Sequence, residues 1–391
     1  MDKARLDKLK DIMCEMIDAK STMGVLCIVV KNGKEEFYHS EGYRNAEEKL
    51  PFTRDTLCNM YSLSKVVTST ACMMLIEEGL MTLTDPVSKF LPEYSKQKCV
   101  GIDGKVRTAG SSLTIENLLN MTSGMPYPGT ASPSEIASGK IMDEVISKMR
   151  TDNAMSTREI ARRYAEVPLS FEPSDKWEYG VSADILGAVI ETITGLKYSD
   201  FLKERLFDPL KMTDTGFYVP EDKLNRFSNK YMETPEGLKL YDRLDLCVDP
   251  MPLKEPAFVS GGAGVISTAD DYLKLMGMLL NKGTFGGIKV LSEKTVEFMT
   301  TPRLNDIQKK SLHEWESLAG FSYGNLMRIM DDPGKARSLG CMGEYGWDSW
   351  TGCYAANVPS ENMTVMIMRQ RGESCTDNYI FRMRNVIFSA L

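Results

Sequence analysis

The segment Ser62-Leu63-Ser64-Lys65 constrains this chain more than any other, because it opens an apolar run, Val66–Leu80, that predicts a helix. A serine and a lysine three residues apart lie on one face of such a helix. The helix N-terminus adds about half a positive charge beneath the hydroxyl, which favours an alkoxide and the oxyanion that follows its attack. A lysine desolvated in a cleft can lose its proton and act as a base. A second match, Ser95–Lys98, lies in a polar stretch typical of a solvated loop.

Other nucleophilic and metal-dependent chemistries find little support in the sequence. The only two histidines, His39 and His313, lie in a strand-like segment and in a polar stretch, and no Gly-x-Ser-x-Gly elbow occurs. A Ser-His-Asp hydrolase is therefore disfavoured, and a lysine-based serine mechanism gains by elimination. The nine cysteines have no metal-ligand spacing, so we expect neither a metal nor a cofactor.

Composition limits the partners that this chain can have. The net charge of −7 comes from interspersed acids and bases, so no nucleic-acid partner is expected. No apolar run reaches the roughly 18 residues of a membrane span, which argues against a membrane partner. Met1–Lys20 predicts an amphipathic helix rather than a signal peptide, and the odd cysteine count fits reduced thiols, so we expect a cytoplasmic protein. The sequence gives no indication of the oligomeric state.

Strands are predicted at both ends of the chain, with helices between them. Asn32-Gly33 separates the β-rich runs Val25–Val30 and Glu35–Ser40, which is a strong hairpin signal. Further strands are predicted at Cys353–Asn357 and Met363–Arg369. The central helices are expected at Ile115–Asn120, Glu135–Met149, Thr157–Glu166 and Ala183–Thr194.

This order predicts an α+β fold of two lobes. One antiparallel sheet would be built from both termini, residues 1–81 and 255–391, and flanked by helices. Residues 82–254 would form an inserted, mostly helical lobe, with the active site at the interface. The glycine-rich stretch Ser260–Gly264 predicts a close backbone approach, since no Gly-Lys-Ser/Thr follows to make it a phosphate loop.

Two later segments hold further candidate site residues. Lys176–Gly187 predicts a loop that runs into a helix, where Tyr179 could present its hydroxyl to a cleft and pass a proton. The alternative is that Tyr179 is a partly buried aromatic tethered by its hydroxyl, as most of the 16 tyrosines are expected to be. Gly346–Cys353 precedes the last strands, and a strand edge there could offer a backbone N–H to an oxyanion, or could simply pack.

Together these motifs resemble the serine β-lactamase and penicillin-binding-protein superfamily. The similarity is greatest to class C β-lactamase-like hydrolases, including family VIII carboxylesterases and lovastatin-type acyltransferases. It covers nearly the whole chain, through Ser62–Lys65, Leu113–Met125, Tyr179–Gly187, Asp208–Phe217 and Ser260–Tyr272. The resemblance implies a β-lactamase/transpeptidase-like fold.

The same resemblance implies roles for individual residues. Ser62 would attack the acyl carbonyl, while Lys65 and Tyr179 would share the proton transfers; which of the two is the base stays open. Backbone N–H groups of Ser62 and Trp350 would form the oxyanion hole. Val181 stands where the family often has asparagine, and we interpret Asp184 as a structural helix residue.

The third family motif, Lys-Thr/Ser-Gly, is replaced here by Trp347-Asp348-Ser349. The lost cation would pair with a β-lactam or peptide carboxylate. Trp347 resembles the tryptophan of the esterases' Trp-Gly-Gly, Ser349 could narrow access to the site, and Asp348 adds negative charge. We expect these three residues and Trp350 to contact an uncharged or cationic ester or amide.

The leading hypothesis is a metal-independent serine hydrolase, similar to carboxylesterases, that acts on a small-molecule acyl substrate through an acyl-enzyme. An acyltransferase on a small molecule is the close variant. A β-lactamase or D-Ala-D-Ala carboxypeptidase is a third hypothesis, and a non-catalytic binding module on the same scaffold is a fourth.

Overall fold

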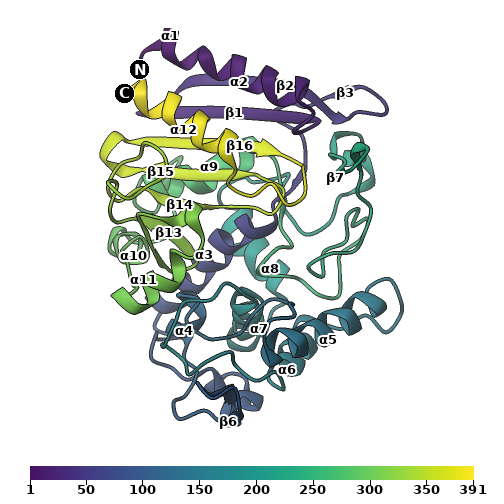
Figure 1. Ribbon diagram of the computed structural model, residues 1–391, viewed down its shortest axis with the longest axis vertical. Coiled ribbons are helices and arrows are strands. Elements are labelled where there is room, and N and C mark those ends of the chain that lie inside the picture. Colours follow the sequence, from purple (N-terminus) through teal and green to yellow (C-terminus); the bar gives the residue numbers. More distant parts are fainter.

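An eight-stranded antiparallel sheet dominates the computed structural model, which describes residues 1–391 (Figure 1). Its strands follow the order β12-β13-β14-β15-β16-β1-β2-β3. Their bounds are β1 Gly24–Lys31, β2 Lys34–Asn45, β3 Leu50–Pro51, β12 Phe321–Gly324, β13 Met327–Met330, β14 Tyr345–Asp348, β15 Tyr354–Val358 and β16 Met363–Arg369. The N-terminal strand β1 pairs with the C-terminal strand β16, so both ends of the chain build one sheet, as the sequence predicts.

The hairpin predicted at Asn32-Gly33 joins β1 to β2. Both turn residues have positive φ, 53° and 72°, as this tight turn requires. The chain termini also meet, since the backbone N–H of Asp2 donates to the carbonyl of Ala390 at 2.8 Å.

Helices cover both faces of the sheet. On one face lie α1 (Lys3–Leu6), α2 (Lys8–Asp18) and the C-terminal α12 (Asn378–Ser389), at the top of Figure 1. Against the other face lie α3 (Ser64–Glu77) and α9 (Ala269–Leu280). Side chains alternate between the faces along each strand. Thus on β15 Ala355 joins the larger core with α3, whereas its neighbour Tyr354 joins the core beneath α12.

Helix α3 crosses the centre of the molecule, and nearly all of its residues are buried. Helix α7 (Ser182–Thr194) packs against α3. In turn α4 (Ile115–Leu119), α6 (Thr157–Tyr164) and α8 (Tyr198–Leu202) pack against α7, and α5 (Pro133–Lys148) packs against α6 (Figure 1). Two further helices are α10 (Glu293–Met299) and α11 (Asp306–Leu312). No helix has both the length and the apolar character needed to cross a membrane.

The remaining elements are short. The two-stranded pairs are β4 (Cys58–Asn59) with β9 (Ile266–Ser267), β5 (Lys98–Val100) with β6 (Val106–Thr108), β7 (Tyr231–Thr234) with β8 (Gly237–Leu240), and β10 (Thr284–Phe285) with β11 (Ile288–Lys289). Short 3-10 helices span Tyr61–Leu63, Val87–Lys89, Pro92–Lys96, Glu221–Arg226, Glu316–Leu318 and Pro359–Glu361, and a π-helix spans Lys203–Phe207.

The α/β fold with a large antiparallel sheet is confirmed, while the division into two lobes at residues 82 and 254 stays a prediction. Within the middle segment, the α-helices and the π-helix end by Phe207. Asp208-Pro209 follows, and a proline cannot continue a helix. Beyond it the chain forms loops, one short 3-10 helix and the β7–β8 hairpin.

Candidate active site

Ser62 lies in a 3-10 turn, Tyr61–Leu63, directly before α3, so it stands at the start of a buried helix as the sequence predicts. Tyr61 has a φ of 43°, an unusual value for a large side chain. Two contacts hold this turn: the hydroxyl of Tyr272 donates to the carbonyl of Leu63 at 2.9 Å, and Ser64 Oγ accepts the N–H of Val265 at 2.9 Å. The serine is therefore presented by a rigid backbone.

Lys65 is completely buried, and its Nζ lies 3.3 Å from Ser62 Oγ. It donates to the carbonyl of Gly262 at 2.8 Å and to the hydroxyl of Tyr127 at 3.1 Å. Burial lowers the pKa of Lys65 to about 7, against smaller opposing effects of Asp184 and Asp348. The amine is thus poised to be neutral near physiological pH.

The glycine-rich turn after Ser260 supplies the carbonyl that contacts Lys65. Asp184, on the first turn of α7, accepts hydrogen bonds from Ser260 Oγ at 2.6 Å and from the N–H of Gly262 at 3.0 Å. A Cβ at Gly261 would lie 2.4 Å from the carbonyl oxygen of Ala183, so only glycine fits there. Asp184 is structural in the sense that it fixes this turn beside the lysine.

Tyr179 lies against Lys65 from the loop that precedes α7. The Lys65 Nζ sits 4.6 Å from the centre of the Tyr179 ring, and the indole N–H of Trp347 donates to the Tyr179 hydroxyl at 3.0 Å. Burial raises the pKa of Tyr179, while interactions with Ser62 and Trp347 oppose that shift. Aromatic rings surround the tyrosine, with centres 5.2 to 6.1 Å from its own: Tyr127, Trp177, Trp315 and Trp347.

The structure places the four residues of the third motif in different surroundings. Trp347 is buried behind Tyr179, and Asp348 accepts a hydrogen bond from the Thr376 hydroxyl. Ser349 Oγ accepts the N–H of Cys353 at 2.9 Å, so its side chain braces the turn after β14. Trp350 is half-buried and packs against Tyr61, with the two rings tilted and their centres 5.1 Å apart.

Neither histidine approaches this cluster. His39 Nε2 lies 3.2 Å from Glu41 on β2, and His313 Nε2 lies 2.7 Å from the carbonyl of Phe321. No group of three or more histidine, cysteine, aspartate or glutamate side chains is arranged to hold a metal ion.

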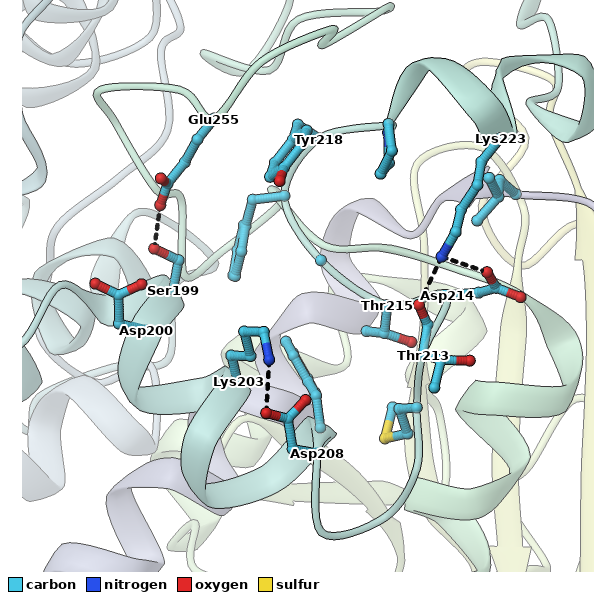
Figure 2. Close-up of a pocket in the computed structure, with 16 residues that line it drawn as sticks. Ser199, Asp200, Lys203, Asp208, Thr213, Asp214, Thr215, Tyr218, Lys223 and Glu255 are labelled. Carbon is cyan, nitrogen blue, oxygen red and sulfur yellow. Dashed lines mark hydrogen bonds and ion pairs between the residues drawn. The ribbon is translucent and has the colours of Figure 1, made fainter.

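A separate cavity of about 430 Å³ lies between α8 and the segment 212–220 (Figure 2). Neither Ser62, Lys65 nor Tyr179 lines it. Its lysines are paired, Lys203 with Asp208 at 2.6 Å and Lys223 with Asp214 at 2.8 Å (Figure 2). Because both lysines are paired, this cavity offers no unpaired cation to a substrate.

Sequence reasoning missed two groups that contact Lys65, the hydroxyl of Tyr127 and the carbonyl of Gly262. Tyr127 lies just beyond the recognised segment Leu113–Met125, but 62 residues separate it from Lys65 and nothing in its spacing marks it. The predicted close approach at Ser260–Gly264 pointed to the second group without naming its partner.

Comparison with known proteins identifies the family. A family model described as Beta-lactamase matches residues 9–379. The chain therefore belongs to the Beta-lactamase family, and within that family it is a serine hydrolase.

Relatives align over most of their length. The chain is 30% identical over 374 residues to Protein Rv1367c of Mycobacterium tuberculosis (strain ATCC 25618 / H37Rv), which covers 93% of this chain and 88% of the relative. It is 28% identical over 364 residues to esterase EstB of Burkholderia gladioli, covering 90% and 85%.

Solved structures share the fold. EstCE1, described as a hydrolase with promiscuous acyltransferase activity, superposes with a TM-score of 0.83 at 22% identity over 99% of both chains. Simvastatin synthase LovD of Aspergillus terreus gives a TM-score of 0.80 at 20% identity, over 99% of this chain and 97% of LovD.

Proposed function

We propose that this chain is a serine esterase that forms an acyl-enzyme on Ser62 with a small-molecule ester and passes the acyl group to water. One observation carries the proposal. Lys65, a fully buried amine with a pKa lowered to about 7, lies 3.3 Å from the hydroxyl of Ser62.

The hydrogen bonds of Lys65 explain how its amine could accept the proton of Ser62. A neutral amine has two N–H bonds and one lone pair. The carbonyl of Gly262 and the hydroxyl of Tyr127 accept the two N–H bonds, which leaves the lone pair for the proton of Ser62. As Ser62 Oγ bonds to the acyl carbon, its proton moves to Lys65.

Tyr179 suits the complementary role. Because burial raises its pKa, its phenol stays protonated near pH 7 and can donate to the departing alkoxide. The ammonium formed on Lys65 lies over the electron-rich face of the same ring, 4.6 Å from its centre, and is stabilised there. We therefore assign the base to Lys65 and the proton delivery to Tyr179. In deacylation water replaces the alcohol and the same groups act in reverse.

Two backbone N–H groups are available for the oxyanion. Neither Ser62 nor Trp350 donates its backbone N–H to another group of the protein. The aromatic contact of Tyr61 with Trp350 ties together the two turns that carry these donors. Losing one donor of this kind typically costs about 10²–10³ in rate.

The third motif supports our proposal for the substrate class. Trp347 provides no cation for a substrate carboxylate, and the negative charge of Asp348 acts on Lys65 and Tyr179. These features favour an uncharged or cationic ester over a β-lactam or a peptide with a free carboxylate. Two relatives are named as esterases, which supports an ester substrate: esterase EstB and the lovastatin esterase of Penicillium rubens, the latter 29% identical over 204 residues.

Acyl transfer to a small-molecule alcohol or amine is the second candidate, favoured by relatives such as acyltransferase mokF of Monascus pilosus, 26% identical over 290 residues. It needs the same three side chains and differs only in the acceptor. A non-catalytic binding module is disfavoured, because such a module would not need a neutral lysine beside a serine.

Intact-mass analysis after reaction with a fluorophosphonate tests the proposal. We expect one adduct on the wild type and none on Ser62→Ala, with turnover of p-nitrophenyl esters reduced by more than about 10³. A folded Ser62→Ala variant that keeps its activity would refute the nucleophile. Product analysis with added alcohols or amines then separates hydrolysis from transfer, and a chromogenic cephalosporin tests for β-lactamase activity.

A further inference from the structure

A narrow cavity on the α12 side of the sheet is lined by three arginines. Arg328 comes from β13, Arg384 from α12, and Arg337 from the segment between β13 and β14. The cavity measures about 10 Å³, which is roughly the space of one water-sized particle. Three guanidinium groups around so small a space call for compensating negative charge.

Two of the three arginines, Arg328 and Arg384, are buried, and only Arg384 is paired with a carboxylate of the protein. Arg384 forms a buried ion pair with Glu344 and also donates to Ser338 Oγ at 2.7 Å and to the carbonyl of Leu339 at 2.9 Å. Arg328 is 3% exposed, has no ion pair, and neither of its two terminal nitrogens finds an acceptor. Arg337 is half exposed, and its nearest carboxylate, Glu316, lies 3.6 Å away.

The environment of Arg328 makes an isolated charge costly. Its guanidinium carbon lies 4.3 Å from the centre of the Tyr354 ring, and Arg384 lies 5.7 Å from that same centre. The ring face offers some stabilisation, but not the hydrogen-bond acceptors that the two nitrogens need. A guanidinium does not lose its proton in a protein, so the charge cannot be relieved in the way a lysine allows. Burying such a charge without a partner is strongly unfavourable.

We propose that this cavity binds a halide-sized monovalent anion, chloride under ordinary conditions, held by the two terminal nitrogens of Arg328. The small volume selects a monatomic ion over phosphate or a carboxylate. Ser317 and Ser338 also line the cavity, and neither donates its hydroxyl proton to a protein acceptor, so both can donate to the anion. Arg337 lies where its positive charge would attract the ion to the site.

The site lies directly behind the strand that carries the third motif. Arg328 pairs with Gly346, the residue before Trp347, and Thr376, which lines the cavity, donates its hydroxyl to Asp348. The anion would therefore neutralise positive charge where β13, β14 and the start of α12 meet. This inference does not depend on the proposed esterase function.

Thermal unfolding in chloride tests the proposal, with ionic strength held constant by gluconate, which is too large for the cavity. We expect the wild-type Tm to rise by about 1–2 °C for each tenfold increase in chloride above the dissociation constant. Arg328→Met should lose this dependence. The matched control is Arg382→Gln on α12, whose exposed ion pair with Glu15 lies outside the cavity and whose loss should leave the response intact.

Anomalous diffraction from wild-type crystals soaked in sodium bromide gives an independent answer, even if Arg328→Met fails to fold. A bromide peak within hydrogen-bond distance of the Arg328 terminal nitrogens supports the site. A water molecule there with no anomalous signal would overturn it, as would a chloride response that persists in a folded Arg328→Met variant.

Discussion

Two buried lysines flank the turn that carries Ser62, and we propose a catalytic role for only one of them. Lys65 and Lys230 are both almost fully buried, and burial lowers the pKa of each to about 7. Lys65 lies 3.3 Å from the Ser62 hydroxyl, whereas Lys230 donates to the hydroxyl of Tyr61 at 2.9 Å. A lowered pKa is thus common to both, and the difference lies in which hydroxyl each amine contacts.

The neighbours of Lys230 indicate a supporting role. Tyr61, its partner, carries the positive φ that precedes Ser62 and contacts the ring of Trp350. Tyr241 also contacts Trp350, with ring centres 5.6 Å apart. We infer that Lys230 holds the side chain of Tyr61 and takes no part in proton transfer.

The largest expected effect separates the two lysines by activity. Lys65→Met removes the base and should lower kcat/KM for a p-nitrophenyl ester by about 10³, within the range measured for general bases. Lys230→Met should lower it by less than about tenfold. Equal losses in the two folded variants would show that the comparison is wrong, and that Lys230 belongs to the proton relay.

The pH dependence of kcat/KM is the next largest effect. Only neutral Lys65 can accept the Ser62 proton, so kcat/KM should fall about tenfold per pH unit below the Lys65 pKa of about 7 and level off above it. A stopped assay with a non-ionising ester measures this limb. Lys230→Met should keep its midpoint; a midpoint that moves by more than about half a pH unit would reassign the titrating group.

The Lys230→Met substitution should change how the free energy of unfolding depends on pH, although it has little effect on activity. Its pKa of about 7 in the folded chain lies below the value of about 10.4 for an exposed lysine. Between these values the unfolded chain carries a proton that the folded chain lacks, so the free energy of unfolding rises with pH through that window. Lys230→Met lacks this contribution. From about pH 7 to about pH 10, the free energy of unfolding of the wild type should therefore rise relative to that of Lys230→Met by roughly 1 kcal/mol per pH unit.

Urea unfolding of both proteins at several pH values measures that difference, and taking the difference cancels the titration of the cysteines and tyrosines that the two proteins share. A stability difference that does not change with pH would mean that Lys230 is protonated in the folded state.

The sequence predicts those parts of the fold and the site that local patterns encode. Ser62 and Lys65 follow from helical spacing, and the β1–β2 hairpin follows from Asn32-Gly33. The hairpin of β12 and β13 was missed, because its turn, Asn325-Leu326, adopts positive φ at both residues without a glycine.

The partners of the two lysines were missed for a different reason. Gly262 lies 197 residues from Lys65 along the chain, and Lys230 lies 169 residues from Tyr61. Such contacts arise only when distant segments pack together, and no local periodicity records them. The unpaired charge of Arg328 is invisible for the same reason, since a sequence does not show which arginine lacks a carboxylate.

Each lysine donates to a tyrosine hydroxyl, and the smallest expected effect concerns the one beside Lys65, that of Tyr127. Tyr127→Phe removes an oxygen 3.1 Å from the Lys65 Nζ. Because that oxygen accepts a hydrogen bond, its loss destabilises the ammonium more than the neutral amine, and the pKa of Lys65 should fall from its value of about 7. The acid limb of kcat/KM should then move to lower pH, while the plateau should drop by tenfold or less as the lone pair loses its fixed direction.

The control is Tyr94→Phe, which deletes a buried hydroxyl bonded to the carbonyl of Ala161 and should leave the profile unchanged. A Tyr127→Phe limb that stays in place or moves to higher pH would mean that this phenol donates to Lys65 instead, and that the lone pair does not face Ser62 in the resting enzyme.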